Sequence, residues 1–372
     1  MHICQFTFEY FPIIAGITVV VERLSHYLSA MGHRITIVTP NFFPHCPKSP
    51  HRVVYFPPPP DNRMTPAWKK ELIRQVSPKI AEVDLIHAHN ALPCGFLSLL
   101  CGAEAVPVVV SCHGFDLIHL PESRYGYGPE HQPLIRRVLA RADHLSVPSK
   151  MLLSQAARRG ANLEKASVIP HGVDIPAVLD SGSGKNRYLL YLGSLNPVKG
   201  VDLLLKAFSL IAGRDRNLKL YLVGDGPEKE KLVKQSLELR LGREVLFKKP
   251  AWGEAKNRLL QESRLVMAPS RSESFGLSVL EAHAAGKPVI AFDVGGLSEV
   301  VANKKTGILV PPGDVEAMAN ETLKLLGNEK KYREYSAAAR KRAESFSWEK
   351  AAQRYLEIYG EAINHSFSSS RT

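Results

Sequence analysis

The chain has 372 residues, a length that suits two globular domains better than one. Hydrophobic residues make up 45% and charged residues 23%, which excludes a disordered or fibrous protein. The formal net charge of +12 favours anionic partners such as nucleotide phosphates or anionic lipid headgroups. Nucleic acid is not an expected partner, because the basic residues are not interleaved with aromatic residues.

The sequence lacks the usual marks of secretion, of a membrane span and of a metal site. The longest apolar run, Ile13–Val21, is far shorter than the ~18 residues that span a bilayer, and no basic segment precedes it. The five cysteines are odd in number and form no CxxC pair. We therefore expect a cytoplasmic protein without a disulfide framework, cofactor or bound metal.

Short apolar runs alternate with longer amphipathic segments along the whole chain. In the first half, strands are expected at Ile3–Phe8, Arg34–Val38, Leu85–Ala88, Val106–Ser111, His144–Val147 and Ser167–Ile169, with helices at Thr18–Met31, Pro93–Glu104, Gln132–Arg141 and Lys150–Arg159. In the second half, strands are expected at Tyr188–Leu192, Lys219–Val223, Val245–Phe247, Leu265–Ala268, Pro288–Phe292 and Gly307–Val310, with helices at Leu203–Ala212, Glu228–Leu241, Gly276–Ala285 and Val315–Leu326.

This alternation predicts an α/β protein with two doubly wound, Rossmann-like domains of parallel sheet. The expected domains cover residues 1–178 and 188–346, and a polar Gly/Ser-rich stretch at 179–187 has the composition of a linker. A terminal helix at 347–363 is expected to pack back towards the N-terminal domain, before a frayed tail at 364–372.

The segment from Pro269 to Ala282 directly follows a predicted strand and opens a helix near Gly276. The first N–H groups of a helix have no partner within it, and the helix dipole is positive there. The backbone amides of Phe275, Gly276 and Leu277 are therefore candidates to hold a phosphate or sugar hydroxyls.

Two glutamates flank this helix start, Glu273 just before it and Glu281 more than one turn inside it. Carboxylates accept hydrogen bonds from vicinal hydroxyls, as a nucleotide sugar presents, but a lone pair of glutamates is more often a dipole contact and a solvated side chain. The loop Leu192–Gly200 favours a ligand site, because it places Lys199, a natural diphosphate partner, next to a glycine that allows close approach.

These motifs, in this order, resemble the retaining glycosyltransferases of the GT-B architecture, sequence family GT4. The family's EX7E motif corresponds to Glu273 and Glu281, and its C-terminal signature continues at Ala285–Ala291 and Gly307–Asp314. In the first half, the segments similar to the family's glycine loop, HG-x-D segment and hinge are Tyr10–Ile17, His113–Asp116 and Ile169–Asp174.

The resemblance implies two domains that face each other across a cleft, and a role for each matched residue. It implies that Lys199 binds the donor diphosphate, Glu281 the ribose hydroxyls and Glu273 a hydroxyl of the transferred sugar. The remaining implied residues are His113, which would meet the reacting sugar, and the donor-binding Gly16, Ser274, Phe275, Gly276 and Leu277.

Three positions depart from the family pattern. Ala15 replaces a glycine of the first loop, Ser194 replaces an arginine that binds diphosphate, and His171 replaces the hinge asparagine. The change at position 194 leaves more of the leaving-group charge to Lys199, or to another cation such as Arg271.

The residues and the resemblance together predict a metal-independent retaining transferase. Its donor is expected to be an NDP-sugar, with UDP favoured over GDP, and its acceptor a hydroxyl of a glycan, glycolipid or small molecule. An Asp-x-Asp pair in a suitable setting is missing, so lysine and helix dipoles would take the place of a metal. Loops at Phe42–Pro60 and His119–Gln132 are expected to shape the acceptor site, the second with Arg124, Tyr125 and Tyr127.

Two other functions stay open on the sequence. The same architecture supports sugar epimerases and phosphorylases, and a non-catalytic nucleotide-sugar-binding partner of a transferase could retain the same fold. The net charge, with Arg136, Arg137 and Arg141 on one predicted helix, is also compatible with peripheral binding to the inner face of an anionic membrane.

Overall fold

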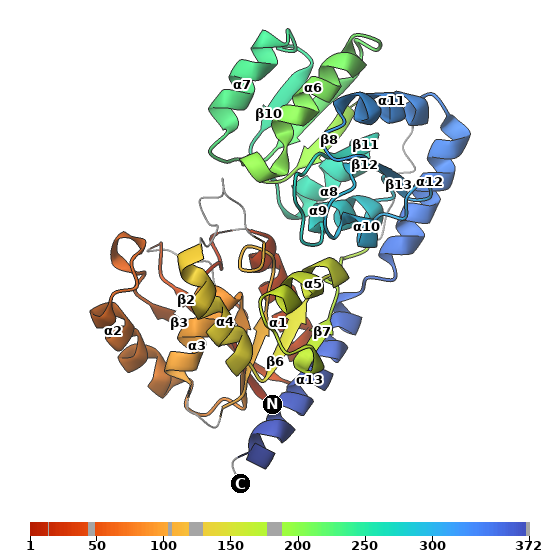
Figure 1. Ribbon diagram of the computed structural model, residues 1–372. Helices are drawn as coiled ribbons and strands as arrows, with labels where there is room; N and C mark the ends of the chain where they lie inside the picture. Colours follow the sequence, from red (N-terminus) through yellow and green to blue (C-terminus); the bar gives the residue numbers. More distant parts are fainter. Residues whose placement is uncertain (14, 44–48, 103–105, 119–128, 177–187, 370–372) are drawn as a thin grey trace. The chain divides into compact units, whose positions relative to one another are not determined.

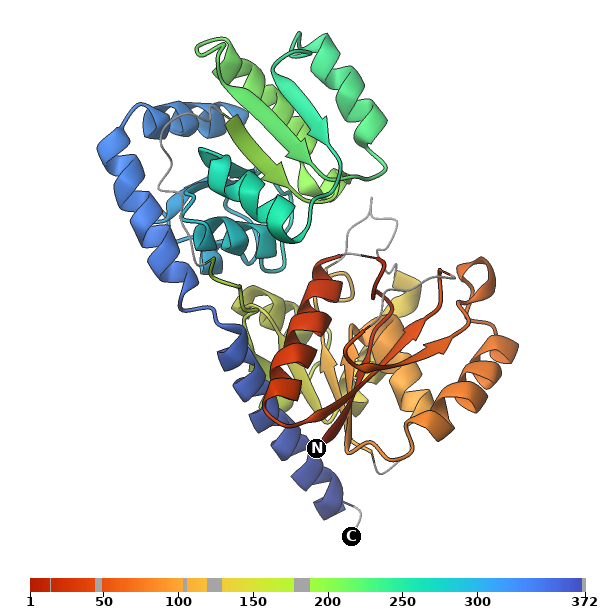
Figure 2. The same cartoon turned by 180° about the vertical axis from the view of Figure 1, so that it is seen from behind.

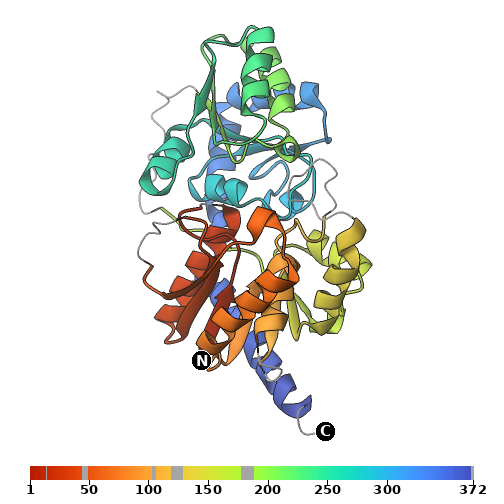
Figure 3. The same ribbon diagram turned by 90° about the vertical axis from the view of Figure 1, so that its left-hand side faces the viewer.

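The computed structural model describes residues 1–13, 15–43, 49–102, 106–118, 129–176 and 188–369. Within these ranges the chain forms two compact units, the first from residues 1–172 and 348–369 and the second from residues 173–347. Each unit is an α/β layer structure with a parallel sheet and helices on both faces (Figures 1 and 3). The described part of the chain holds no helix with both the length and the apolar character needed to cross a bilayer.

The first unit contains a seven-stranded sheet in the order β3-β2-β1-β4-β5-β6-β7, and its strand pairs are all parallel. Its strands are β1 (His2–Phe6), β2 (Arg34–Pro40), β3 (Arg52–Phe56), β4 (Leu85–His89), β5 (Val108–Ser111), β6 (His144–Val147) and β7 (Ala166–Val168). Its helices are α1 (Gly16–Ala30), α2 (Pro66–Val76), α3 (Phe96–Cys101), α4 (Gln132–Arg141), α5 (Lys150–Arg158) and α13 (Trp348–Ser369).

The second unit contains a six-stranded parallel sheet in the order β10-β9-β8-β11-β12-β13. Its strands are β8 (Tyr188–Leu192), β9 (Lys219–Val223), β10 (Val245–Lys248), β11 (Leu265–Ala268), β12 (Val289–Phe292) and β13 (Gly307–Val310). Its helices are α6 (Val201–Ala212), α7 (Lys229–Glu238), α8 (Gly253–Glu262), α9 (Leu277–Ala284), α10 (Leu297–Val300), α11 (Val315–Leu326) and α12 (Glu329–Ala343).

Burial on both faces explains the continuous apolar strands. On β12, Ile290 and Phe292 point into one hydrophobic cluster, whereas Val289 and Ala291 point into the other. The two clusters lie on opposite faces of the sheet because successive side chains of a strand alternate. The predicted fold class, two doubly wound parallel-sheet domains, is therefore confirmed.

In each sheet the strand order reverses direction once, between β1 and β4 in the first unit and between β8 and β11 in the second. Ligands of open α/β sheets bind beyond the carboxyl ends of the strands at this switch point. The loops that follow β1, β4, β8 and β11 are therefore the ones in which to look for a site.

Several elements were not expected from the sequence. Strand β3 lies at the sheet edge beside a proline-rich loop, and α8 and α12 are surface helices with mostly polar residues. Helix α2 buries Trp68, Leu72 and Val76. Helix α13 continues to Ser369, beyond residue 364, where the frayed tail is expected to begin, and fraying of that tail stays a prediction. No glycine or proline interrupts the chain between residues 361 and 369, and nothing in its sequence stops the helix there.

The predicted linker at 179–187 lies outside the described residues, and the domain boundaries stay predictions.

Helix α13 belongs to the first unit, where it packs against α1 (Figure 2). Its start is fitted closely against Gly172. A Cβ atom added to Gly172 would lie 2.2 Å from the backbone nitrogen of Trp348. Since a real Cβ atom does not approach so closely, the helix can start here only beside a glycine.

We therefore predict that Gly172→Ala lowers the free energy of unfolding by about 1–3 kcal/mol, the usual cost of overpacking. The matched control is Gly213→Ala, where the nearest atom to an added Cβ lies 3.5 Å away. Denaturant unfolding should show a change of at most about 0.5 kcal/mol for this control. Equal effects of the two substitutions would contradict the close docking of α13.

Candidate functional site

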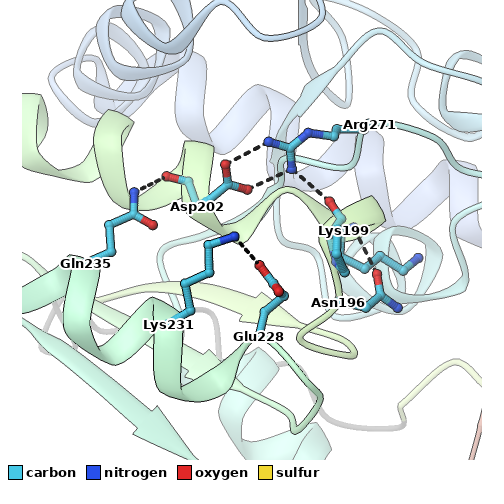
Figure 4. A network of polar contacts seen from close by, with 8 residues as sticks. Asn196, Lys199, Asp202, Glu228, Lys231, Gln235 and Arg271 are labelled. Atoms are coloured by element: carbon cyan, nitrogen blue, oxygen red, sulfur yellow. Dashed lines mark hydrogen bonds and ion pairs between the residues drawn. The ribbon is translucent and has the colours of Figure 1, made fainter. Parts of the chain in front are cut away.

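The loop after β8 carries Lys199 at the end of a short 3₁₀ turn, Pro197–Lys199. The Asn196 side chain caps this turn by accepting a hydrogen bond from the backbone nitrogen of Lys199, at 3.2 Å (Figure 4). The next residue, Gly200, has φ +63°, and a Cβ there would lie 2.1 Å from the carbonyl oxygen of Pro269. The lysine loop is thus fixed against the loop that follows β11.

Lys199 and Glu273 form an ion pair at the switch point of the second sheet. The distance from Nζ of Lys199 to Oε2 of Glu273 is 2.6 Å, and the side chains are 27% and 14% exposed. The Ser270 hydroxyl donates to the same carboxylate oxygen at 3.3 Å. An ammonium group has three donors and a carboxylate about four acceptor sites, so both partners keep capacity for a ligand.

The backbone of Glu273 is held from the other side by the loop after β12. Gly296 donates its backbone N–H to the carbonyl oxygen of Glu273 at 2.9 Å. Its neighbour Gly295 has φ +56°, and a Cβ there would lie 2.0 Å from the same oxygen. These contacts account for the two glycines that follow β12.

Helix α9 begins directly after Gly276, whose φ of +99° is a conformation that glycine adopts readily. The first intrahelical donors are the N–H groups of Val279 and Leu280, which both bond the carbonyl oxygen of Gly276. The N–H groups that precede Val279 lie at the N-terminus of α9 and make no hydrogen bond within the helix. The helix dipole favours a negative charge at this end. The side chain of Phe275 is buried and packs edge-on against Phe346, so only its backbone can take part in binding.

Glu281 lies on α9 and is held by a lysine that the sequence did not single out. Nζ of Lys256 on α8 lies 2.5 Å from Oε1 of Glu281, and both side chains are mostly buried. The signal that could have found it is the helical spacing of Lys256, Leu259 and Leu260, the inward positions of α8.

Arg271, named above as a cation that could take the role of the missing arginine, pairs with a carboxylate of the same unit. Its guanidinium makes two hydrogen bonds of 2.7 Å to the carboxylate of Asp202 (Figure 4). A third hydrogen bond goes to the carbonyl oxygen of Pro197. Arg271 therefore braces the lysine loop. Ser194 accepts a hydrogen bond from the Asn196 amide at 2.9 Å and supports the same loop.

Two predicted residues belong to the first unit. Gly16 is the exposed first residue of α1, and the preceding Ala15 is extended, with φ −121°. The structure thus accommodates alanine in the first loop without a positive φ. His113 follows β5, is 9% exposed and hydrogen-bonds through Nε2 to Nδ1 of His89 at 3.1 Å. Residues 119–128, with Arg124, Tyr125 and Tyr127, lie outside the described residues.

Three buried histidines, His87, His89 and His171, gather beside His113, and all four have lowered pKa values. Burial lowers the pKa of His113 to about 4 and that of His87 to about 3. Burial also lowers the pKa values of His89 and His171 well below the usual range, with smaller contributions from the neighbouring histidines. The described residues contain no group of three or more His, Cys, Asp or Glu side chains able to hold a metal ion.

Two family descriptions match the chain, one for each half. The family described as "Glycosyltransferase Family 4" matches residues 14–176, and that described as "Glycosyl transferases group 1" matches residues 180–342. A D-inositol 3-phosphate glycosyltransferase from Rhodococcus erythropolis is 32% identical, over 76% of this chain and 69% of that protein. An N-acetyl-alpha-D-glucosaminyl L-malate synthase from Bacillus anthracis is 28% identical, over 95% of this chain and 96% of that protein.

Solved structures share the fold. Sucrose-phosphate synthase from Thermosynechococcus elongatus superposes with a TM-score of 0.84 at 22% identity, covering 98% of this chain and 99% of that one. Anabaena HepE in complex with UDP and glucose gives a TM-score of 0.80 at 21% identity, covering 97% and 99%. The fold is that of GT-B glycosyltransferases. The two family matches and the relative at 32% identity show that the chain is a transferase of sugars. It belongs to glycosyltransferase family 4.

The buried histidines predict a steep loss of stability in acid. Their pKa values are lower in the folded chain than the 6.5 of an ordinary histidine, so between those values the unfolded chain binds more protons. The free energy of unfolding should therefore fall as the pH drops from 6.5 towards 4. The shift of His113 alone corresponds to about 3 kcal/mol.

Denaturant unfolding at a series of pH values measures this dependence. His87→Phe removes one buried imidazole, so unfolding of this variant should take up about one proton fewer in acid. Its free energy of unfolding should therefore fall less steeply with decreasing pH than that of the unmodified protein. Identical slopes for the two proteins would show that His87 does not stay neutral in the fold.

Proposed function

We propose that the chain is a metal-independent, retaining glycosyltransferase. It would move a sugar from a nucleoside diphosphate sugar, with UDP favoured over GDP, to a hydroxyl of a glycan, glycolipid or small-molecule acceptor. The observation that carries the proposal is the Lys199–Glu273 ion pair, fixed by glycines just before the N-terminus of α9.

The chemistry follows from where charge develops during transfer. The bond between the anomeric carbon and the diphosphate oxygen breaks through an oxocarbenium-like state, and negative charge grows on the diphosphate. The ammonium group of Lys199 and the amides that open α9 would stabilise that charge. Glu273 would accept a hydrogen bond from the transferred sugar, and Glu281 from the ribose.

Retention is proposed from the resemblance to the retaining GT4 enzymes, and the matched motifs contain no obvious enzymic nucleophile for a double displacement. The acceptor oxygen would then attack on the face from which the diphosphate leaves, forming the new bond to the anomeric carbon. Its proton would pass to an oxygen of the departing diphosphate, so that no separate strong base is needed.

The relatives support both the donor and the acceptor class. HepE is named as a complex with UDP and glucose, which supports a UDP-sugar donor. The related inositol 3-phosphate transferases and malate synthase are named for small acceptors that carry negative charge. The net charge of +12 agrees with an anionic acceptor of this kind.

We predict that Lys199→Ala lowers turnover about 100- to 1,000-fold, as the loss of one preorganised charge-stabilising donor does. Its melting temperature should stay close to that of the unmodified protein, because a part-exposed ion pair contributes little to stability. The control is Lys231→Ala on α7, which removes an exposed lysine paired with Glu228 (Figure 4). Near-normal transfer by the Lys199 variant would reject the role.

A ligand screen tests the donor and the metal. A compound that binds only the folded chain raises its melting temperature, so UDP and UDP-sugars should give larger shifts than GDP, ADP or their sugars. Transfer should continue in excess chelator, and the product should keep the anomeric configuration of the donor. Equal shifts with all nucleotides would contradict the preference for UDP, and loss of transfer in chelator would contradict metal independence.

Peripheral binding to anionic membranes is part of the same proposal. Helix α4 exposes Arg136, Arg137 and Arg141, and basic residues near an anionic surface each contribute about 1 kcal/mol. Flotation with vesicles that contain anionic lipid should recover the chain at low salt and lose it at high salt. Recovery that does not depend on salt, or no recovery at all, would remove this part of the proposal.

A further inference from the structure

The buried histidines of the first unit form a stacked column. The ring centroids of His87 and His89 lie 4.3 Å apart, those of His89 and His113 lie 5.4 Å apart, and those of His113 and His171 lie 5.4 Å apart. The planes of His89 and His113 are within 11° of parallel. The four rings belong to the buried part of the first unit, where polar side chains need hydrogen-bond partners.

One chain of hydrogen bonds leads from β1 to His113. Nε2 of His89 lies 2.7 Å from Oε1 of Gln5, and Nδ1 of His89 lies 3.1 Å from Nε2 of His113. The Gln5 amide directs Oε1 towards His89, while its nitrogen is buried without a hydrogen-bond partner among the described residues. Since an amide oxygen can only accept, this orientation assigns the proton of His89 to Nε2. A neutral imidazole has one proton, which leaves Nδ1 of His89 as an acceptor. His113 must then donate from Nε2, and its own Nδ1 is unprotonated.

The neutral state on which this assignment depends follows from burial. Gln5 and His89 are completely buried, and burial lowers the pKa of both His89 and His113. The groups packed around the two rings, His87 and His171, are also histidines with lowered pKa values. At neutral pH each ring therefore holds a single proton.

The backbone that carries His113 is fixed as well. The carboxylate of Asp116 accepts a hydrogen bond from the backbone nitrogen of Ala91 at 2.7 Å and another from Gly114 at 3.3 Å. Gly114 has φ +134°, a conformation that favours glycine. The HG-x-D segment is thus a closed turn that holds the His113 ring against His89.

We propose that Gln5 and His89 are positioning residues that set the tautomer of His113, so that its Nδ1 accepts a hydrogen bond from a hydroxyl of the ligand sugar. This inference rests on the proposed function, since it assigns His113 to a sugar. Among the described residues, none hydrogen-bonds to Nδ1 of His113. A neutral nitrogen lone pair suits a sugar hydroxyl, which can donate, and does not suit a phosphate oxygen, which cannot.

Nitrogen-15 NMR of the full chain with labelled histidine reads the tautomer directly. Two-bond proton–nitrogen spectra distinguish a protonated from an unprotonated ring nitrogen, and His113→Gln assigns the signals by their loss. In the unmodified protein, His113 should show a protonated Nε2 and an unprotonated Nδ1. The opposite tautomer would overturn the inference.

Three variants test whether His89 sets that state. His89→Phe keeps a ring but removes the acceptor, so a population with protonated Nδ1 should appear on His113. His89→Asn keeps an amide oxygen near the position of Nδ1 and should restore the original tautomer. The matched control is His87→Phe, because His87 bonds Ser111 and Tyr359 and not His113. An unchanged His113 tautomer in His89→Phe would overturn the inference.

A second pair of variants covers the case in which His89→Phe does not fold. Gln5→Leu removes the acceptor for Nε2 of His89 and should give a mixture of tautomers at His113. Gln5→Glu keeps an acceptor oxygen and should give the tautomer of the unmodified protein. Identical spectra for the two Gln5 variants would also overturn the inference.

Kinetics connect the tautomer with transfer. Loss of one hydrogen bond to the sugar should lower kcat about tenfold in His89→Phe, with little change in KM, and His89→Asn should recover most of it. The spectra are recorded without donor or acceptor. If no nucleotide sugar were ever transferred, the proposed function would fail while the tautomer assignment could still hold, so the two failures can be told apart.

Discussion

The 2.6 Å contact between Nζ of Lys199 and Oε2 of Glu273 is the interaction on which the second unit's site depends. The two residues are 74 positions apart in the chain. They meet because β8 and β11 are neighbours in a parallel sheet, whose strands all end at the same edge. A carboxylate next to an anion site would repel a diphosphate. With a lysine on it, the same carboxylate can bind a sugar hydroxyl beside a negatively charged leaving group.

Backbone contacts, and not side-chain packing, fix this pair in place. Gly200 lies against the carbonyl oxygen of Pro269, and Gly295 lies against that of Glu273, each so closely that no Cβ atom fits. The loops after β8, β11 and β12 are therefore tied together at three glycine-dependent contacts, the third made by Gly296 against Ser274. Arg271 strengthens the arrangement by linking Asp202 to the lysine loop. A site held in this way is preorganised, as stabilisation of a developing charge requires.

The sequence predicted this second unit better than the first unit, for physical reasons. Continuous apolar strands and their turn residues are local signals, so β8, β9, β11 and β13 were expected with their observed bounds. The ion pair of Glu281 with Lys256 and the engagement of Arg271 by Asp202 depend on which loops meet in space. Local sequence does not carry that information, so Lys256 was missed and the pairing of Arg271 with Asp202 was not expected.

The histidine column shows the same limit in the first unit. Gln5, His89 and His113 lie on β1, β4 and the turn after β5, and only the parallel pairing of these strands brings them into one hydrogen-bond chain. The sequence pointed to His113 through its motif, but not to the residues behind it. Each unit, taken by itself, thus places polar groups after its strand ends: a lysine with helix amides in the second, and a neutral histidine in the first.

The most direct test of the account is a crystal structure of the full chain with a bound nucleoside diphosphate. The account predicts that Nζ of Lys199 lies within hydrogen-bond distance of a diphosphate oxygen, with the phosphates at the N-terminus of α9. A diphosphate bound elsewhere, with Lys199 in contact with Glu273 alone, would contradict it.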